Sequence, residues 1–336
     1  MTAVVLDAPG AFRLTETPPT APGPGEVLVA VHACGVCGSD RELWHGTRPD
    51  GYVRYPVTPG HEWSGTVQAA GEGVTPDLVG RKVVGEGFRN CQTCDRCRAG
   101  DTTLCTAGYD ETGFTRPGAM ADTLTLPARL VHTLPDDADL TAAALLEPAA
   151  CSAAAALEAG LRPGERAAVV GDGTLGLTAL QFLAAMSPAE LLLVGGSRHR
   201  ADLARSLGAG VFRTKDDPPG PDRAGYDVVV ETAGAPASAQ AAAALLRRGG
   251  RLVLTGIPGP GAAGLDPADL VVRRIEVRTV FGAPPRAWSH AVRAFRTGLL
   301  RTTPLITHRK PLTDSGAAIA LVGSADPAVG KVLLHP

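Results

Sequence analysis

Hydrophobic patterning divides the chain into two kinds of region. Up to about Val131, short apolar runs alternate with turns rich in Gly and Pro, as at Val27–Ala33, Gly65–Ala70 and Lys82–Gly85. Short strands closed by such turn residues are typical of an all-β domain with a barrel-like sheet. We therefore expect a β-rich domain in the first part of the chain.

From Thr141 onward, helical and strand-like segments alternate. An Ala-rich stretch from Thr141 to Leu161 predicts a helix. The predicted segments after it are strand Ala167–Val170, helix Thr174 to about Met186, strand Leu191–Val194, helix Arg200–Leu207, strand Asp227–Val230, helix Ser238–Arg247, and strands Arg251–Thr255 and Ile275–Phe281. Nearly continuous apolar strands separated by helices indicate a parallel sheet covered on both faces. After Pro284 the pattern is mixed again, so this last segment is expected to rejoin the first domain.

Composition fits an ordinary globular protein with two modest domains. The 336 residues are 44% hydrophobic and carry a formal net charge of −2. The sequence has no basic stripe, so nothing in its charge pattern suggests nucleic acid or an anionic membrane as a partner. The N-terminal segment Met1–Leu14 contains Asp7 and Pro9, and the longest apolar stretch, Ala142–Ala159, contains Glu147. Neither resembles a signal peptide or a membrane span, so we expect a cytoplasmic protein.

A glycine-rich motif follows the predicted strand at Ala167–Val170 and opens the next helix. Its residues are Gly171, Asp172, Gly173, Thr174, Leu175 and Gly176. In a dinucleotide-binding turn the first glycine permits the tight turn, and the second lets the backbone approach the pyrophosphate. The third glycine lets helix and strand pack closely. The strand before and the helix after meet the context that this motif requires. We predict that Gly171, Gly173, Thr174, Leu175 and Gly176 bind a dinucleotide.

The end of the next predicted strand indicates which dinucleotide binds. Enzymes that use NAD usually carry Asp or Glu there, to hold the ribose hydroxyls. Here the segment from Gly195 to Arg200 has no acid and contains Ser197, Arg198 and Arg200. A hydroxyl and two guanidinium groups suit a 2′-phosphate, so we predict NADP(H) in preference to NAD(H). The alternative is that both arginines only solvate the first turn of a helix.

Four of the seven cysteines lie close together in a segment of about residues 88–108. They are Cys91, Cys94, Cys97 and Cys105. Two-residue spacings between cysteines suit a tetrahedral zinc site of four thiolates. A reducing compartment disfavours disulfides, and an iron–sulfur cluster remains the other metal-based alternative. We predict a structural zinc.

A second set of possible ligands is spread along the chain. Cys37 is followed by Ser39, His61 and Glu62 are adjacent, and Glu147 precedes a proline. Thiolate, imidazole and carboxylate together form an open donor set that suits a catalytic zinc with one position left for water or substrate. Each residue also has an ordinary structural explanation: a small core residue, a satisfied histidine or a helix-capping acid.

These residues occur together in a recognisable order. The segments that carry the resemblance are Gly35-Val36-Cys37-Gly38-Ser39-Asp40, Gly60-His61-Glu62-x-x-Gly65, the four cysteines and the glycine motif. Over essentially the whole chain they resemble the zinc-containing medium-chain dehydrogenase/reductase superfamily, on its polyol (sorbitol, threonine and cyclitol) dehydrogenase side. The resemblance implies the α/β fold class, with a GroES-like β-barrel catalytic domain and a Rossmann doubly wound parallel sheet. It places the catalytic domain at residues 1–150 and 285–336, and the NADP-binding domain at 151–284.

The resemblance also assigns roles within the site. It implies Cys37, His61 and either Glu62 or Glu147 as ligands of a catalytic zinc, because the two carboxylates exchange at the metal or act through water in such enzymes. With the four-cysteine site this makes one catalytic and one structural zinc per chain. Ser39 matches the hydroxyl that hands on the alcohol proton. Glu42 stands where some relatives carry a relay histidine, which leaves the path beyond Ser39 open. A homodimer or homotetramer is expected.

The function expected from all of this is a zinc-dependent NADP(H)-linked alcohol dehydrogenase acting on a polyol, cyclitol or aminocyclitol. The run Gly60–Gly65 resembles dehydrogenases of antibiotic biosynthesis that act on aminocyclitols such as 2-deoxy-scyllo-inosamine. Trp44, Tyr52 and Phe114 either line the substrate pocket or pack in the core. Two alternatives are an NADPH-dependent enone or quinone reductase and a non-catalytic nucleotide-binding zinc protein.

Overall fold

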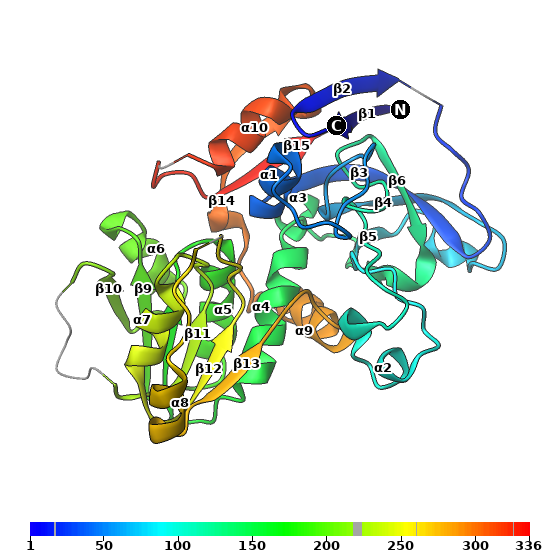
Figure 1. Cartoon of the computed structure of the whole chain (residues 1–336). Coiled ribbons are helices and arrows are strands. Elements are labelled where there is room, and N and C mark those ends of the chain that lie inside the picture. The colour runs from blue at the N-terminus through cyan, green and yellow to red at the C-terminus, as the bar shows by residue number, and fades with distance from the viewer. Residues whose placement is uncertain (17, 218–223, 260, 325) are drawn as a thin grey trace. The chain divides into compact units, whose positions relative to one another are not determined.

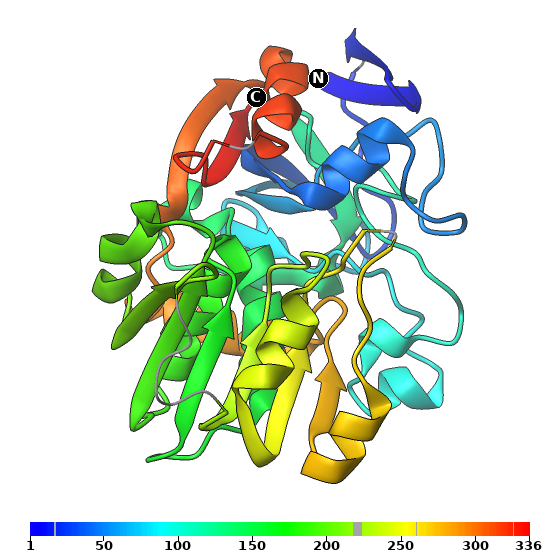
Figure 2. The ribbon, with the colours of Figure 1, turned by 60° about the vertical axis from the view of Figure 1, so that its left-hand side comes forward.

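The computed structural model describes residues 1–16, 18–217, 224–259, 261–324 and 326–336, which form two compact units. The first unit comprises Met1–Glu147, Pro284–Arg296 and Thr302–Pro336. The second comprises Pro148–Ala283 and Thr297–Arg301. Figures 1 and 2 show the elements of each unit from two directions.

The first unit is built on a seven-stranded sheet with the order β14-β15-β3-β4-β5-β7, in which β6 also pairs with β3. A separate antiparallel hairpin is formed by β1 and β2. The strands are β1 (Thr2–Ala8), β2 (Ala11–Glu16), β3 (Glu26–Val36), β4 (Glu62–Ala70), β5 (Lys82–Gly85), β6 (Thr123–Pro127), β7 (Val131–Thr133), β14 (Ile306–Pro311) and β15 (Lys331–His335). The helices are α1 (Gly38–His45), α2 (Asp95–Arg98), α3 (Leu140–Ala143), α9 (Pro285–Arg296) and α10 (Ser315–Val322). Short 3₁₀ turns are η1 (Pro76–Leu78), η2 (Thr102–Leu104), η3 (Ala128–Leu130), η5 (Thr303–Leu305) and η6 (Leu312–Asp314).

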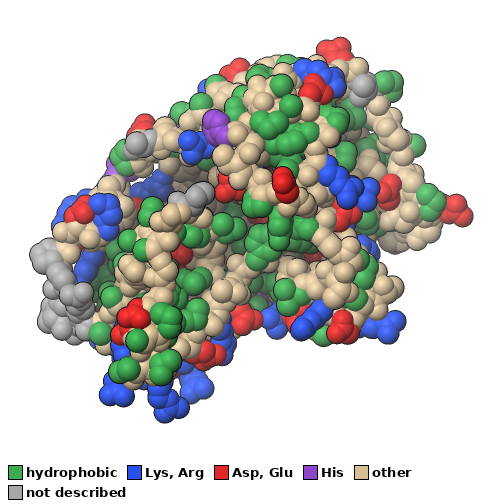
Figure 3. Space-filling model, viewed as in Figure 1, with side chains coloured by type: hydrophobic (Ala, Val, Ile, Leu, Met, Phe, Trp, Pro, Cys, Tyr) green, Lys and Arg blue, Asp and Glu red, His purple; other side chains and the backbone are tan. Residues whose placement is uncertain are grey.

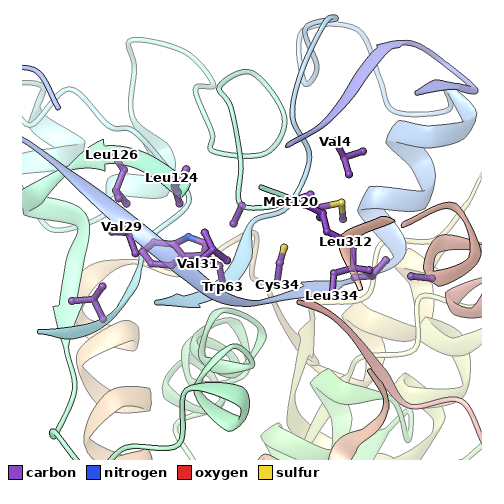
Figure 4. Packing of buried hydrophobic residues seen from close by; sticks show 14 of the residues in the cluster. Val4, Val29, Val31, Cys34, Trp63, Met120, Leu124, Leu126, Leu312 and Leu334 are labelled. Atoms are coloured by element: carbon purple, nitrogen blue, oxygen red, sulfur yellow. The ribbon is translucent and has the colours of Figure 1, made fainter. Parts of the chain in front are cut away.

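The core of the first unit lies on β3, which pairs with β4, β6 and β15. Figure 4 shows Val29, Val31, Trp63, Leu124 and Leu126 in this core, all of them buried. Burying side chains of this kind contributes about 1.5–3 kcal/mol each. The ends of β3 and β4 are therefore held firmly, and the predicted zinc ligands lie at those ends.

The second unit is a six-stranded parallel sheet with the order β10-β9-β8-β11-β12-β13. Its strands are β8 (Arg166–Val170), β9 (Glu190–Gly195), β10 (Val211–Thr214), β11 (Tyr226–Glu231), β12 (Leu246–Leu254) and β13 (Glu276–Thr279). Its helices are α4 (Leu146–Ala159), which starts at the end of the first unit, α5 (Thr174–Ala184), η4 (Arg198–Arg200), α6 (Ala201–Ser206), α7 (Ser238–Leu245) and α8 (Pro267–Arg273). Counted along the chain, the strand order is 3-2-1-4-5-6, which is the order of dinucleotide-binding sheets.

Some local expectations were wrong. The single helix expected from Thr141 to Leu161 is broken into α3 and α4. Pro148 explains the break, because proline donates no backbone hydrogen bond and its ring clashes with the preceding turn of a continuous helix. The helix therefore restarts at Leu146 with Pro148 in its first turn. Strand β12 begins at Leu246, directly after α7, and α1 interrupts the region that was expected to be β-rich.

The visible face of the molecule carries both signs of charge. On the face drawn in Figure 3, acidic and basic side chains are interspersed, and the formal net charge of the chain is −2. Among the described helices, none combines the length and the apolar character needed to cross a bilayer.

Candidate active site and metal centres

Two groups of metal-ligand residues converge in the first unit. One contains Cys91, Cys94, Cys97 and Cys105, and the other contains Cys37, His61 and Glu62. Within each group, the possible ligand atoms all lie within 4.8 Å of one another. These are the two sets that the sequence predicted, except that Glu147 is outside the second group.

The four-cysteine group is formed around the short helix α2. Cys94 caps this helix, and its sulfur accepts a hydrogen bond from the backbone N–H of Cys97. The Cys91 sulfur accepts hydrogen bonds from the side chain and backbone of Thr93 and from the backbone of Cys94, which lower the pKa of Cys91 to about 5. A thiolate is therefore favoured there at neutral pH, and four sulfurs at this spacing fit tetrahedral zinc.

The second group is assembled by two neighbouring strands. Cys37 follows β3 and caps α1, and its sulfur accepts a hydrogen bond from the backbone N–H of Ser39. His61 precedes β4, which pairs antiparallel with β3, and its Nε2 lies 3.2 Å from the Cys37 Sγ. Gly35 pairs with Glu62 across the two strands, and a Cβ atom at Gly35 would overlap the Glu62 carboxylate. The glycine before Cys37 thus leaves room for a carboxylate beside the thiol and the imidazole.

Asp40 supports both His61 and Cys37. Its Oδ2 accepts a hydrogen bond of 3.0 Å from the backbone N–H of Cys37, and its Oδ1 lies 3.5 Å from His61 Nδ1. Burial lowers the pKa of His61, but Cys37 and Asp40 outweigh it and raise that pKa well above its usual value. Within the described residues, Asp40 Oδ1 and His61 Nδ1 have no hydrogen-bond partner, so this contact is the ion pair alone. A carboxylate on Nδ1 leaves Nε2 as the nitrogen that faces a metal, as in many zinc sites.

Lys331 is a member of the site that sequence reasoning missed. Its Nζ lies 2.6 and 2.7 Å from the two carboxylate oxygens of Glu62 and 3.3 Å from the carbonyl oxygen of Val36. The relative exposure of Lys331 is 4%, and that of Glu62 is 2%. Burial lowers the pKa of Lys331, but Glu62 and Cys37 raise it above its usual value. Strand β15 brings this lysine to the site, and a lone lysine near the end of a sequence carries no local signal of such a role.

Two further carboxylates lie within electrostatic range of the site. Burial raises the pKa of Glu147 to about 7, with Glu62 and Glu111 adding to the shift and His61 opposing it. Glu111 is also buried, which raises its pKa, and it accepts a hydrogen bond from the Tyr109 hydroxyl. Among the described residues, the convergent group therefore takes Glu62 as its carboxylate, with Glu147 nearby. Glu111 had no signal in the sequence.

The three aromatic candidates have different surroundings. Phe114 is buried in a small core, and its ring centroid lies 4.7 Å from that of His61. Trp44 packs against Phe12 at 4.9 Å, and Tyr52, at 40% exposure, lies 4.7 Å from Tyr109. Phe114 therefore contacts a predicted zinc ligand through its ring.

In the second unit, the three glycines of the β8–α5 turn have distinct geometries. Gly171 has a φ of +115°, and a Cβ there would lie 2.5 Å from the Thr232 hydroxyl. A Cβ at Gly176 would overlap the Gly171 carbonyl, so α5 packs closely on the strand. A Cβ at Gly173 would meet nothing within 4 Å, which leaves its backbone open to a ligand. This turn, followed at once by Thr174 and Leu175 at the start of α5, fits a pyrophosphate at a helix N-terminus.

The three residues predicted to select NADP lie in one turn after β9. The Ser197 hydroxyl accepts a hydrogen bond from the backbone N–H of His199 and caps η4. Arg198 forms an ion pair of 2.7 Å with Asp217, and Arg200 donates a hydrogen bond to the Asp172 carbonyl. The turn therefore presents a hydroxyl and two guanidinium groups, with the two arginines already in contact with polar partners.

Comparison with known proteins identifies the family. Residues 23–136 match the alcohol dehydrogenase GroES-like domain, and residues 174–297 match the zinc-binding dehydrogenase family. Sorbitol dehydrogenase of chicken (Gallus gallus) is 30% identical over 344 residues, covering 97% of this chain and 96% of the relative. This chain belongs to the zinc-containing medium-chain dehydrogenase/reductase family. L-threonine 3-dehydrogenase of Symbiobacterium thermophilum is 32% identical and covers 98% of this medium-chain dehydrogenase and 96% of its own length.

A solved structure extends the likeness to the whole fold. A Sinorhizobium meliloti protein described as a zinc-binding dehydrogenase, with NADP bound, superposes with a TM-score of 0.92 at 29% identity. The superposition covers 100% of this chain and 99% of the other. The expected superfamily, its polyol dehydrogenase branch and the fold class are confirmed. This medium-chain dehydrogenase is thus a zinc-binding oxidoreductase of the alcohol dehydrogenase type that uses a nicotinamide dinucleotide and a small-molecule alcohol.

Proposed function

We propose that this medium-chain dehydrogenase uses NADP(H) to oxidise a secondary alcohol of a polyol, cyclitol or aminocyclitol, or to reduce the corresponding ketone. The observation that carries the proposal is the convergence of Cys37, His61 and Glu62 in one group, in which His61 and Glu62 are buried and Cys37 is partly buried. The name of the chicken relative, sorbitol dehydrogenase, supports a polyol as the substrate class. We also propose that the chain works as a homodimer or homotetramer.

Two zinc ions fit the donor sets. Cys37, His61 and Glu62 would hold one, with Glu147 replacing Glu62 or acting through water, and the four-cysteine group would hold the other. When bound, the first zinc supplies a Lewis acid that lowers the pKa of the substrate alcohol, and the nicotinamide supplies the hydride acceptor.

The residues of the chain then have separate tasks. The Ser39 hydroxyl, 3.1 Å from the Cys37 sulfur, relays the proton: it accepts the one that leaves the substrate hydroxyl and passes its own to solvent. Asp40 holds the His61 ring so that its Nε2 faces Cys37. Lys331 fixes the Glu62 carboxylate beside these two residues. Positioned groups of this kind accelerate proton transfer because they need no rearrangement during the reaction.

The proposed preference for NADP(H) rests on Ser197, Arg198 and Arg200. The segment from Gly195 to Arg200 has no acid, and two guanidinium groups with one hydroxyl suit a 2′-phosphate. The NADP in the Sinorhizobium meliloti structure supports this choice.

Metal analysis and a substrate screen test the proposal together. The purified protein is expected to hold about two zinc ions per chain, one tetrahedral in the four-cysteine group and one in the open group. Cys37→Ala should lose one zinc and all turnover, whereas Cys34→Ala, at a buried cysteine of β3 outside the convergent group, should keep both zinc ions. The screen offers NADP and NAD with polyols, cyclitols, 2-deoxy-scyllo-inosamine and simple secondary alcohols.

Other outcomes would contradict the proposal in distinct ways. One zinc per chain with reduction of enones or quinones would identify a reductase of a different type. Dinucleotide binding with no turnover on any substrate would identify a non-catalytic role. Equal zinc loss in Cys37→Ala and Cys34→Ala would show that Cys37 acts through folding rather than as a ligand.

A further inference from the structure

A carboxylate that the sequence rule does not find lies at the end of β9. Dinucleotide-binding sheets that use NAD usually present an acid at the end of the second strand, and here Gly195 and Gly196 occupy that place. A Cβ atom at Gly195 would lie 2.7 Å from Oδ2 of Asp172, and one at Gly196 would lie 3.8 Å from Oδ1. The Asp172 carboxylate therefore reaches the end of β9 from the glycine-rich turn after β8.

A second carboxylate lies beside Arg198. Asp217 Oδ1 is 2.7 Å from Arg198 Nη2, and its Oδ2 accepts a hydrogen bond of 2.8 Å from the backbone N–H of Thr214 at the end of β10. The hydrogen bond from Thr214, together with Arg198, lowers the pKa of Asp217, so this carboxylate is charged at neutral pH. The Arg198 side chain is 73% exposed, so a ligand anion can compete with Asp217 for it.

We propose that Asp172 and Asp217 determine how strongly this enzyme discriminates between the two coenzymes. Asp172 accepts a hydrogen bond from the adenosine ribose of NAD(H) and repels a 2′-phosphate. Asp217 competes with the 2′-phosphate of NADP(H) for Arg198. The inference rests on the proposed coenzyme site at Ser197, Arg198 and Arg200, and it predicts a modest preference for NADP(H), with NAD(H) also bound.

The two carboxylates have different expected effects. Removing the charge of Asp217 frees Arg198 for the phosphate and should tighten NADPH binding roughly two- to fivefold, the range that exposed ion pairs support. It should leave NADH binding unchanged, because NADH has no 2′-phosphate. Removing the charge of Asp172 should weaken NADH binding about tenfold, as expected for a lost hydrogen bond to a charged acceptor, and should tighten NADPH binding.

Direct binding measurements test this inference without relying on turnover. NADPH and NADH are titrated separately into the full-length zinc-loaded protein, and the fluorescence of the reduced nicotinamide gives each dissociation constant. The variants are Asp172→Asn, Asp172→Ser and Asp217→Asn, with Asp202→Asn as the control. Asp202 is an exposed acid paired with Arg205 in the next helix, so its variant changes the net charge equally. Circular dichroism verifies that each variant is folded. If Asp172→Asn does not fold, Asp172→Ser provides the same test.

The outcomes separate this inference from the proposed function. Ratios of the two dissociation constants that change as expected in the Asp172 and Asp217 variants, but not in Asp202→Asn, support it. Ratios that stay at the wild-type value in both sets of variants overturn it. The wild-type ratio of the two dissociation constants tests the proposed preference, because tighter binding of NADH than of NADPH would refute it. In that case the change of the ratio in the variants would still test whether Asp172 and Asp217 control the discrimination between the coenzymes.

Discussion

Replacing Lys331 by methionine should destabilise the metal-free protein strongly. Methionine keeps an unbranched side chain but removes the ammonium group that contacts both oxygens of Glu62. The Glu62 carboxylate, at 2% exposure, would then be a buried charge without its cation. Removing one partner of a buried ion pair costs about 3–5 kcal/mol. For a domain of 150–250 residues this corresponds to a decrease in melting temperature of roughly 6–20 °C. A zinc ion bound beside Glu62 replaces the missing positive charge, so the loss should be smaller in the zinc-loaded protein.

Urea unfolding of the metal-free and zinc-loaded proteins at neutral pH measures this effect. The double variant Glu62→Gln with Lys331→Met should recover most of the lost stability, because neutral side chains of similar size often replace a buried ion pair at little cost. Lys82→Met is the matched control, since the Lys82 ammonium donates to the Ala138 carbonyl and its loss should cost about 1.5–3 kcal/mol. If Lys331→Met costs no more than Lys82→Met, or if the double variant is as unstable as Lys331→Met, the ion pair does not have the role inferred from its geometry.

Four further predictions concern the two metal groups. Because the pKa of Glu147 is raised from 4.5 to about 7, the folded metal-free protein binds that proton more tightly than the unfolded chain. Its stability should therefore fall by about 3 kcal/mol as the pH rises from 4.5 through 7; Glu147→Gln should remove this part of the pH dependence of the urea midpoint, and an unchanged profile would contradict it. Asp40→Asn should weaken zinc binding about 10- to 100-fold in competition with a chelator, because His61 loses the carboxylate on its Nδ1; an unchanged affinity would mean that Asp40 serves only the fold. Cys97→Ser should remove one zinc and lower the thermal stability while leaving the visible spectrum of cobalt at the other site, and two retained zinc ions would refute a structural site there. Ser39→Ala should lower kcat by about 10²–10⁴-fold with zinc content unchanged, and wild-type turnover would exclude Ser39 as the proton relay.

Features formed by residues that are close together in the sequence could be predicted from it. The glycine-rich turn from Gly171 to Gly176 has the strand before it and the helix after it that its pattern requires. The four cysteines between Cys91 and Cys105 converge because short spacings alone bring their sulfurs together. Cys37 and His61 were separate candidates in the sequence, and the family resemblance, rather than spacing, placed them in one site. Local errors arose where one residue overrode the pattern, as Pro148 does in the expected long helix.

The tertiary structure decided which charged groups surround these motifs. Lys331 reaches Glu62 because β15 pairs with β3, a contact between residues 269 positions apart. Asp172 reaches the end of β9 because β8 and β9 are neighbours in the parallel sheet. An acid from the turn after β8 therefore occupies the place where the sequence rule expects an acid at the end of β9. The sequence by itself determined the four-cysteine and dinucleotide-binding motifs, since their geometry is set by covalent spacing. The partners of Glu62 and Arg198 were decided only by strand pairing and burial, because a charged side chain looks the same in the sequence whether it faces solvent or a buried carboxylate.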